Sequence, residues 1–343
     1  MPSTGPSARL PAWKAALFAL IPLVVVFGAA EGVLIAMDYP PKSAVVGPHG
    51  DNDYWIVEPN LKDSSFLHKE LGTYFYVSTN DRSMRYHDTP VGRQDGVLRI
   101  MALGDSTTFG WGVNDADTYP QVLEGLLKGK APGMDIQVIN GGVMGYSTFQ
   151  GLHHMRKRVM AYEPDIYLFG YIVQDARRSP ISDRDQAISH RASELWEANP
   201  LYNWRTYLWM RNTYQKYRSA RREDEAKDGE TWRVPPTEYA DNLKELAHLA
   251  QEADGMPVLF GFPLEVVGYT KAHREVMAEV AKAEGLKHFD PSQALFEASR
   301  KETLYFPKDR GHPNAAGCRV IARELASWLE SSGALAEAAA HRK

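Results

Sequence analysis

The sequence predicts a flavodoxin-like three-layer α/β/α fold, in which helices cover both faces of a five-stranded parallel sheet. Short, mostly apolar runs rich in β-forming residues alternate with amphipathic stretches of helical period, a pattern typical of parallel strands buried on both faces. At 343 residues with 44% hydrophobic content, the chain is long and apolar enough to bury such a core. The expected strands are 98–103, 136–139, 166–171, 258–262 and 286–289, and the expected helices are 119–127, 150–161, 238–253, 273–283 and 315–329.

An apolar segment at residues 15–37 precedes this alternation. Its length of about 20 residues is what a helix needs to cross the hydrocarbon core of a membrane. Arg9 and Lys14 come before it, whereas Asp38 and Asp51 follow it. This asymmetry favours a cytoplasmic stretch at residues 1–14 and an extracytoplasmic location for the rest. A cleaved signal peptide, with the small residues 28–30 as its cleavage site, is the alternative.

We expect residues 38–69 to form a linker and a lead-in to a domain that spans residues 70–333. Proline and glycine are frequent in 38–52, as in linkers, and residues 54–96 are aromatic and polar without a clear period. The lead-in is expected to pack on the main domain. Residues 334–343 are expected to form a C-terminal tail.

The alternation of strands and helices fails at about residues 176–236, which we expect to be a helical insertion. One interpretation is a cap whose aromatic side chains shape an acyl or sugar pocket. The other is an insertion whose aromatic side chains pack on the core while its basic side chains face solvent. The residues concerned are Trp196, Tyr202, Trp204, Tyr207, Trp209, Tyr214 and Tyr217, with Lys216, Arg218, Arg221 and Arg222.

Two short polar segments carry the candidate chemistry. Ser106 directly follows the first core strand, where a doubly wound fold binds its ligands. Asp309 and His312 lie three residues apart near the C-terminus, a spacing that lets one turn present both side chains to the same point. A serine needs a base to become a nucleophile, and a histidine base needs a carboxylate to hold its tautomer. The alternative is that these residues only cap helices and turns.

The combination of Gly104-Asp105-Ser106 with Asp309-x-x-His312 resembles the SGNH (GDSL-type) hydrolases, over roughly residues 70 to 330. A membrane-anchored bacterial type is the expected member. The resemblance implies the SGNH hydrolase fold, with Ser106, His312 and Asp309 as the catalytic triad. It also implies an oxyanion hole made by the Ser106 N–H, by Gly145 and by a third donor after the strand at 166–171. At that third position the family has asparagine and this chain has Gln174, which offers the same amide on a longer stem.

Composition excludes several other classes of function. A formal charge of −4 gives no general attraction to nucleic acid, and a single cysteine, Cys318, rules out an internal disulfide framework. We expect that cysteine to be buried and inert. No His-Glu-x-x-His or paired-cysteine motif is present, and the adjacent His153 and His154 face different directions on a helix. No metal or other cofactor is therefore expected.

The expected function is that of an extracytoplasmic serine esterase anchored in the membrane by its N-terminal helix. The resemblance implies carboxylic-ester substrates, with O-acetylated polysaccharides or lipid esters foremost. An O-acyltransferase with the same triad is an alternative, because both activities use one acyl-enzyme. A non-catalytic envelope protein that binds glycan in the same cleft is the alternative from another class.

Overall fold

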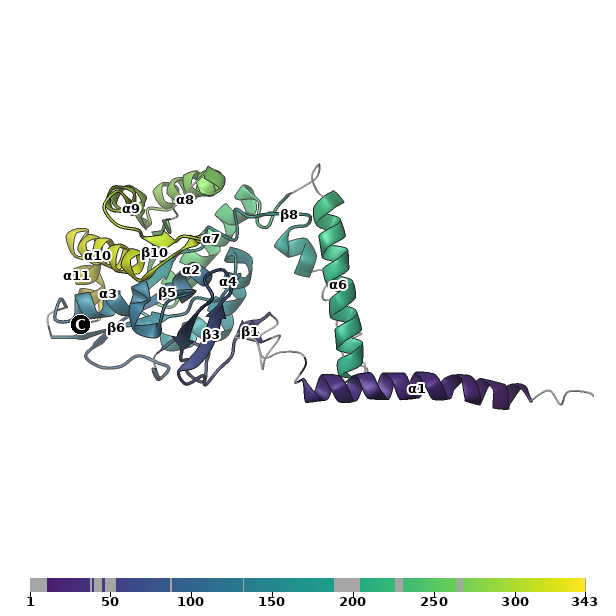
Figure 1. The fold of residues 1–343 in the computed structure, drawn as a ribbon. Coiled ribbons are helices and arrows are strands. Elements are labelled where there is room, and N and C mark those ends of the chain that lie inside the picture. The colour runs from purple at the N-terminus through teal and green to yellow at the C-terminus, as the bar shows by residue number, and fades with distance from the viewer. Residues whose placement is uncertain are drawn as a thin grey trace, which may run out of the picture. The chain divides into compact units, whose positions relative to one another are not determined.

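The computed structural model describes residues 11–37, 39, 45–46, 54–86, 88–131, 133–187, 204–225, 231–263 and 268–342. Contacts divide the chain into two units (Figure 1). The helical unit comprises Met1–Ser43 and Ala187–Asp228, and the sheet unit comprises Ala44–Gln186 and Gly229–Lys343. Each unit is described by itself.

The sheet unit contains the predicted five-stranded parallel sheet. Its strands are β5 (Val97–Leu103), β6 (Asp135–Asn140), β7 (Ile166–Phe169), β10 (Met256–Phe260) and β11 (Lys287–Phe289). They lie in the order β11-β10-β7-β5-β6, and every neighbouring pair is parallel. In chain order this is the flavodoxin-like arrangement 2-1-3-4-5, whose switch point lies beside β5.

Helices cover both faces of this sheet, as Figure 1 shows. Ile100 and Ala102 of β5 belong to one apolar cluster, and Met101 and Leu103 belong to the other, because successive side chains of a strand point to opposite faces. The first cluster includes residues of α3 (Tyr119–Leu127), α9 (Ser292–Ser299), α10 (Ala315–Ser331) and α11 (Ala334–His341). The second includes residues of α7 (Pro236–Glu252) and α8 (Lys271–Ala283) and of the helical segment after β6.

Two helical regions differ from the expectation. The helix expected at 150–161 is α4 (Thr148–His154), which continues as a π-helical turn at Met155–Val159 and a 3₁₀ turn at Met160–Tyr162. The expected tail at 334–343 contains α11, whose Leu335 and Ala338 lie one helical turn apart and are buried. Those side chains bury apolar area in the core, which a solvated tail could not do.

The lead-in packs on the main core through a hairpin, β3 (Ser64–His68) and β4 (Thr73–Val77). The boundary predicted at residues 69/70 falls inside this hairpin, because backbone hydrogen bonds pair β3 with β4 across it. Phe75 and Val77 are buried in the same cluster as Met101 of the sheet. A further short pair, β1 (Val45–Val46) with β2 (Ile56–Val57), precedes it, and most of the linker 38–52 lies outside the described residues.

The helical unit consists of α1 (Ala12–Ala36) and α6 (Arg205–Glu225). The carboxylate of Glu31 on α1 accepts hydrogen bonds from the Arg205 N–H, the Thr206 N–H and the Thr206 hydroxyl. It thereby caps the first turn of α6, whose backbone N–H groups have no partner within the helix. The transmembrane segment predicted at 15–37 is not supported, since the described part of the chain holds no helix long and apolar enough to span a bilayer.

The insertion expected at 176–236 contains the long helix α6, and the short antiparallel strands β8 (Arg178–Ser179) and β9 (Thr231–Trp232) lie near its two ends in the sequence. The α6 aromatics Trp209, Tyr214 and Tyr217 are exposed, as is Trp204 just before the helix. Trp196 and Tyr202, with the side chains of Lys216, Arg218, Arg221 and Arg222, lie outside the described residues.

Candidate active site

Ser106 is the first residue of a short helix, α2 (Ser106–Phe109), just beyond the carboxyl end of β5. Asp105 caps this helix, since its carboxylate accepts from the Thr107 N–H at 2.8 Å and from the Thr107 hydroxyl at 2.6 Å. Burial raises the pKa of Asp105, and the hydrogen bonds from Thr107 oppose that effect. The side chain of Asp105 is therefore occupied with the turn, which leaves Ser106 as the candidate nucleophile of the motif.

A close approach of two backbone segments holds this turn. A Cβ atom added to Gly142 would lie 2.3 Å from the backbone N of Phe109, inside van der Waals contact. Only glycine lets the loop after β6 pack this tightly against α2. The loop that carries the second candidate donor is thereby brought to the helix that carries Ser106.

His312 and Asp309 lie together on β13 (Asp309–Pro313), which pairs antiparallel with β12 (Tyr305–Phe306). The Oγ of Ser106 is 2.8 Å from Nε2 of His312, and Nδ1 of His312 is 2.7 Å from Oδ2 of Asp309. The structure therefore brings together the three residues named from the sequence, across a separation of 206 positions between Ser106 and His312. Each ring nitrogen of His312 has one partner, as a base oriented by a carboxylate requires.

The electrostatic environment favours an ionised Asp309. Burial on its own would raise the pKa of this carboxyl. The hydrogen bond from His312 and the electrostatic attraction of His312 and His68 outweigh burial, so the pKa of Asp309 lies below its usual value. A carboxylate that stays ionised can stabilise the imidazolium formed when His312 takes a proton.

Two backbone N–H groups are free to stabilise an oxyanion. Within the described residues, neither the Ser106 N–H nor the Gly145 N–H donates to a protein acceptor. Gly145 has φ of +80°, a left-handed conformation that favours glycine. Its loop is held by Trp55 of the lead-in, whose indole N–H donates to the Met144 carbonyl at 2.7 Å. Tyr146 returns a hydrogen bond to the Trp55 carbonyl at 2.6 Å.

The side chain of Gln174 is oriented by an arginine. Nη1 of Arg233 donates to Oε1 of Gln174 at 2.6 Å and to the carbonyl of Gly145 at 3.0 Å. Because a guanidinium only donates, the oxygen of the amide must face Arg233, and the N–H₂ group points elsewhere. That N–H₂ group has no acceptor in the described part of the chain. Arg233 is itself held by Asp183 through two contacts of 2.9 Å.

Asp175, the neighbour of Gln174, is a structural residue. Its carboxylate accepts from the Thr148 N–H at 2.9 Å and from the Thr148 hydroxyl at 2.5 Å, and so fixes the start of α4. Burial raises the pKa of Asp175 to about 7 against the opposing effect of these hydrogen bonds.

The other candidate nucleophile is inert. Cys318 on α10 is 1% exposed, and burial raises the pKa of its thiol to about 12. Almost no thiolate exists near neutral pH, so Cys318 is a packing residue.

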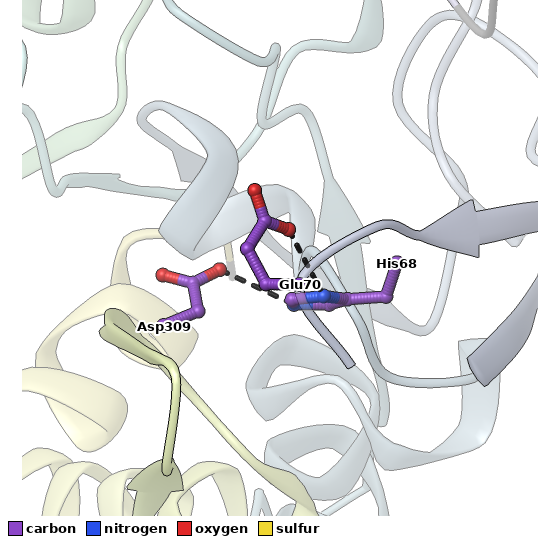
Figure 2. Close-up of side chains that lie close together, drawn as sticks. All are labelled: His68, Glu70 and Asp309. Carbon is purple, nitrogen blue, oxygen red and sulfur yellow. Dashed lines mark ion pairs between the residues drawn. The ribbon is translucent and has the colours of Figure 1, made fainter. Parts of the chain in front are cut away.

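Sequence reasoning missed a group of side chains that contact the candidate triad. His68 and Glu70 of the β3–β4 hairpin lie against Asp309 (Figure 2). Their ligand-type atoms lie within 4.8 Å of one another, so this is also the group of described residues with the chemistry to hold a metal ion. No spacing motif could have revealed it, because two of the residues are more than 200 positions from the third. Arg233 gave no sequence signal either, because it lies 59 positions from Gln174 and in no recognisable motif.

The model of the GDSL-like Lipase/Acylhydrolase family matches residues 102–320. No curated protein matches the sequence. Similar solved structures include a lipase/acylhydrolase from Enterococcus faecalis, at 15% identity and a TM-score of 0.46, covering 68% of this chain and 96% of that one. A variant of an acetyl xylan esterase from Geobacillus stearothermophilus, at 17% identity and a TM-score of 0.45, covers 68% and 94%.

Proposed function

The chain belongs to the GDSL-like lipase/acylhydrolase family, and on that premise we propose that it is a serine esterase whose triad is Ser106, His312 and Asp309. The observation that carries this proposal is the continuous contact from the Ser106 hydroxyl to His312 and on to Asp309, at 2.8 and 2.7 Å. The first distance is short enough for direct proton transfer, and the second holds the imidazole in the tautomer that accepts the proton at Nε2.

The reaction proceeds in two halves. The Ser106 oxygen attacks the ester carbonyl while Nε2 of His312 takes the hydroxyl proton, and that proton then passes to the departing alcohol. A water molecule, deprotonated by the same nitrogen, then attacks the acyl-enzyme. The bond between the acyl carbon and Ser106 breaks, the proton passes from His312 to the Ser106 oxygen, and the acid is released. The N–H groups of Ser106 and Gly145 and the amide of Gln174 are the proposed donors to the oxyanion, each worth about 3 kcal/mol of the barrier.

The proposed substrates are carboxylic esters, with O-acetylated polysaccharides or lipid esters foremost. Family membership supports this class. Acyl transfer to a sugar hydroxyl uses the same acyl-enzyme. The two activities therefore differ only in whether water or a sugar hydroxyl accepts the acyl group. Acetyl release from p-nitrophenyl acetate, measured with and without added glycan, separates the two, since a transferase acetylates the glycan and an esterase produces only acetate.

Labelling with a fluorophosphonate probe tests the nucleophile directly. The wild type is expected to be labelled at Ser106, and Ser106→Ala is expected to lose both labelling and ester turnover while its thermal midpoint stays nearly unchanged. Ser299→Ala, at an exposed hydroxyl on α9, is the matched control and should behave as the wild type. A folded wild-type protein that resists the probe would instead favour a non-catalytic protein that binds glycan.

The location outside the cytoplasm stays a prediction that rests on the charges around the apolar N-terminal segment. Fractionation of cells that produce the full chain tests it, and recovery in the cytosolic fraction would contradict it.

A further inference from the structure

The β3–β4 hairpin places a second imidazole against the proposed catalytic carboxylate (Figure 2). Nε2 of His68 is 3.2 Å from Oδ2 of Asp309, the same oxygen that lies 2.7 Å from Nδ1 of His312. On the other side of the ring, Nδ1 of His68 is 3.3 Å from Oε2 of Glu70. One carboxylate oxygen therefore lies between two histidines, and the second histidine has a carboxylate of its own.

His68 is held rigidly in this position. It is 0% exposed and lies between aromatic rings, with centroid distances of 5.1 Å to Phe306 and 6.1 Å to Trp111. A Cβ atom on Gly112 would come within 2.7 Å of its ring. A buried polar ring costs free energy unless its nitrogens find partners. Neither nitrogen of His68 makes a hydrogen bond of good geometry, so the adjacent carboxylates are its compensation.

We infer that His68, supported by Glu70, is a positioning residue that fixes the orientation of Asp309 and through it the orientation of His312. This inference rests on the proposed function. With a proton on Nε2, His68 attracts the oxygen that His312 uses, so rotation of the Asp309 carboxylate would break two favourable contacts. The lead-in thus completes the support of the triad.

A series of substitutions in the full chain tests the inference. His68→Leu removes both nitrogens at similar volume, and His68→Gln keeps an N–H donor near the position of Nε2. His248→Gln is the matched control, because His248 forms an exposed pair with Glu252 on α7, remote in sequence from both triad segments. The measurements are kcat and KM for p-nitrophenyl acetate, the rate constant of fluorophosphonate labelling, and the pH profile of kcat/KM.

His68→Leu is expected to lower kcat and the labelling rate constant by about 10- to 100-fold, the scale of a misplaced catalytic group, with KM within about twofold. His68→Gln should recover part of this loss, and His248→Gln should match the wild type. Within the described residues, the charged groups that face His68 are Asp309 and Glu70, and the rings of Trp111 and Phe306 pack against it. The attraction of His68 helps to hold the pKa of Asp309 below its usual value, so loss of His68 should raise that pKa and move the acid limb of the profile to higher pH. Unchanged kcat and labelling in a folded His68→Leu protein would overturn the inference.

Two further measurements separate this inference from its rivals. If the wild type neither hydrolyses esters nor reacts with the probe, the proposed function fails. In that case a double-mutant cycle of thermal midpoints tests whether His68 and Asp309 interact. If the shift of the His68→Leu, Asp309→Asn double variant equals the sum of the two single shifts, the inference is overturned. Elemental analysis gives the other measurement. One equivalent of zinc in the purified wild type that is lost in His68→Leu would show that these side chains bind a cation, and would also overturn the positioning role.

Discussion

Replacing Gln174 with glutamate tests whether this residue stabilises the oxyanion. Arg233 donates to Oε1 of Gln174 at 2.6 Å, so glutamate keeps both the length of the side chain and its contact with the arginine. The substitution replaces the N–H₂ group at the other end with an oxygen and adds a negative charge. Loss of one oxyanion donor costs about 3 kcal/mol, and about 1.36 kcal/mol corresponds to tenfold in rate, so kcat should fall by roughly two powers of ten.

The assay is steady-state hydrolysis of p-nitrophenyl acetate. KM is expected to change little, because the negative charge that Gln174 meets develops only in the transition state. Gln174→Leu should cause a similar loss of kcat without adding a charge, and Gln251→Glu at an exposed site on α7 is the control for charge. If both Gln174 variants keep kcat within about threefold of the wild type, Gln174 is not an oxyanion donor and the two backbone groups act alone.

Two further predictions concern the framework around the site. Burial raises the pKa of Asp175 to about 7. Between about pH 4 and pH 7 the folded state therefore holds a proton on this carboxyl that the unfolded state has released. The free energy of unfolding falls as the pH rises through this range. The thermal midpoint of Asp175→Asn minus that of the wild type should therefore be larger at pH 8 than at pH 5. An equal difference at the two pH values would contradict this. Gly142→Ala should lower both the thermal midpoint and kcat, since its Cβ would lie 2.3 Å from the Phe109 backbone N and displace α2. Gly125→Ala on α3, where an added Cβ meets nothing within 4 Å, should instead stabilise by about 0.5–1 kcal/mol, and equal melting of the two variants would refute the steric argument.

The sheet could be predicted from the sequence because its signals are local. Each core strand is a short apolar run, and α3 begins and ends at the predicted residues 119 and 127. The helix at 150–161 was predicted less well. Its apolar spacing suits a continuous helix, and no proline marks the change to π-helical and 3₁₀ turns after His154. That change depends on how the segment packs, which periodicity does not report.

The candidate nucleophile and base were also accessible from sequence, because each lies in a compact motif. Ser106 follows a strand, and Asp309 and His312 lie three residues apart. The residues that hold them in place lie in segments without such motifs. Trp55 and His68 come from an aperiodic lead-in, and Arg233 comes from the end of the insertion.

The sequence alone thus determined the five strands of the parallel sheet, several of the helices that cover it, and which polar side chains lie at the ends of strands. Only the tertiary structure decided that a hairpin from the lead-in contacts Asp309, and that Arg233 orients Gln174 beside the Gly145 loop. The physical reason is that strand and helix formation depends on neighbours a few residues apart. Contacts between Asp309 and His68, by contrast, depend on how complete surfaces fit together once those elements have packed.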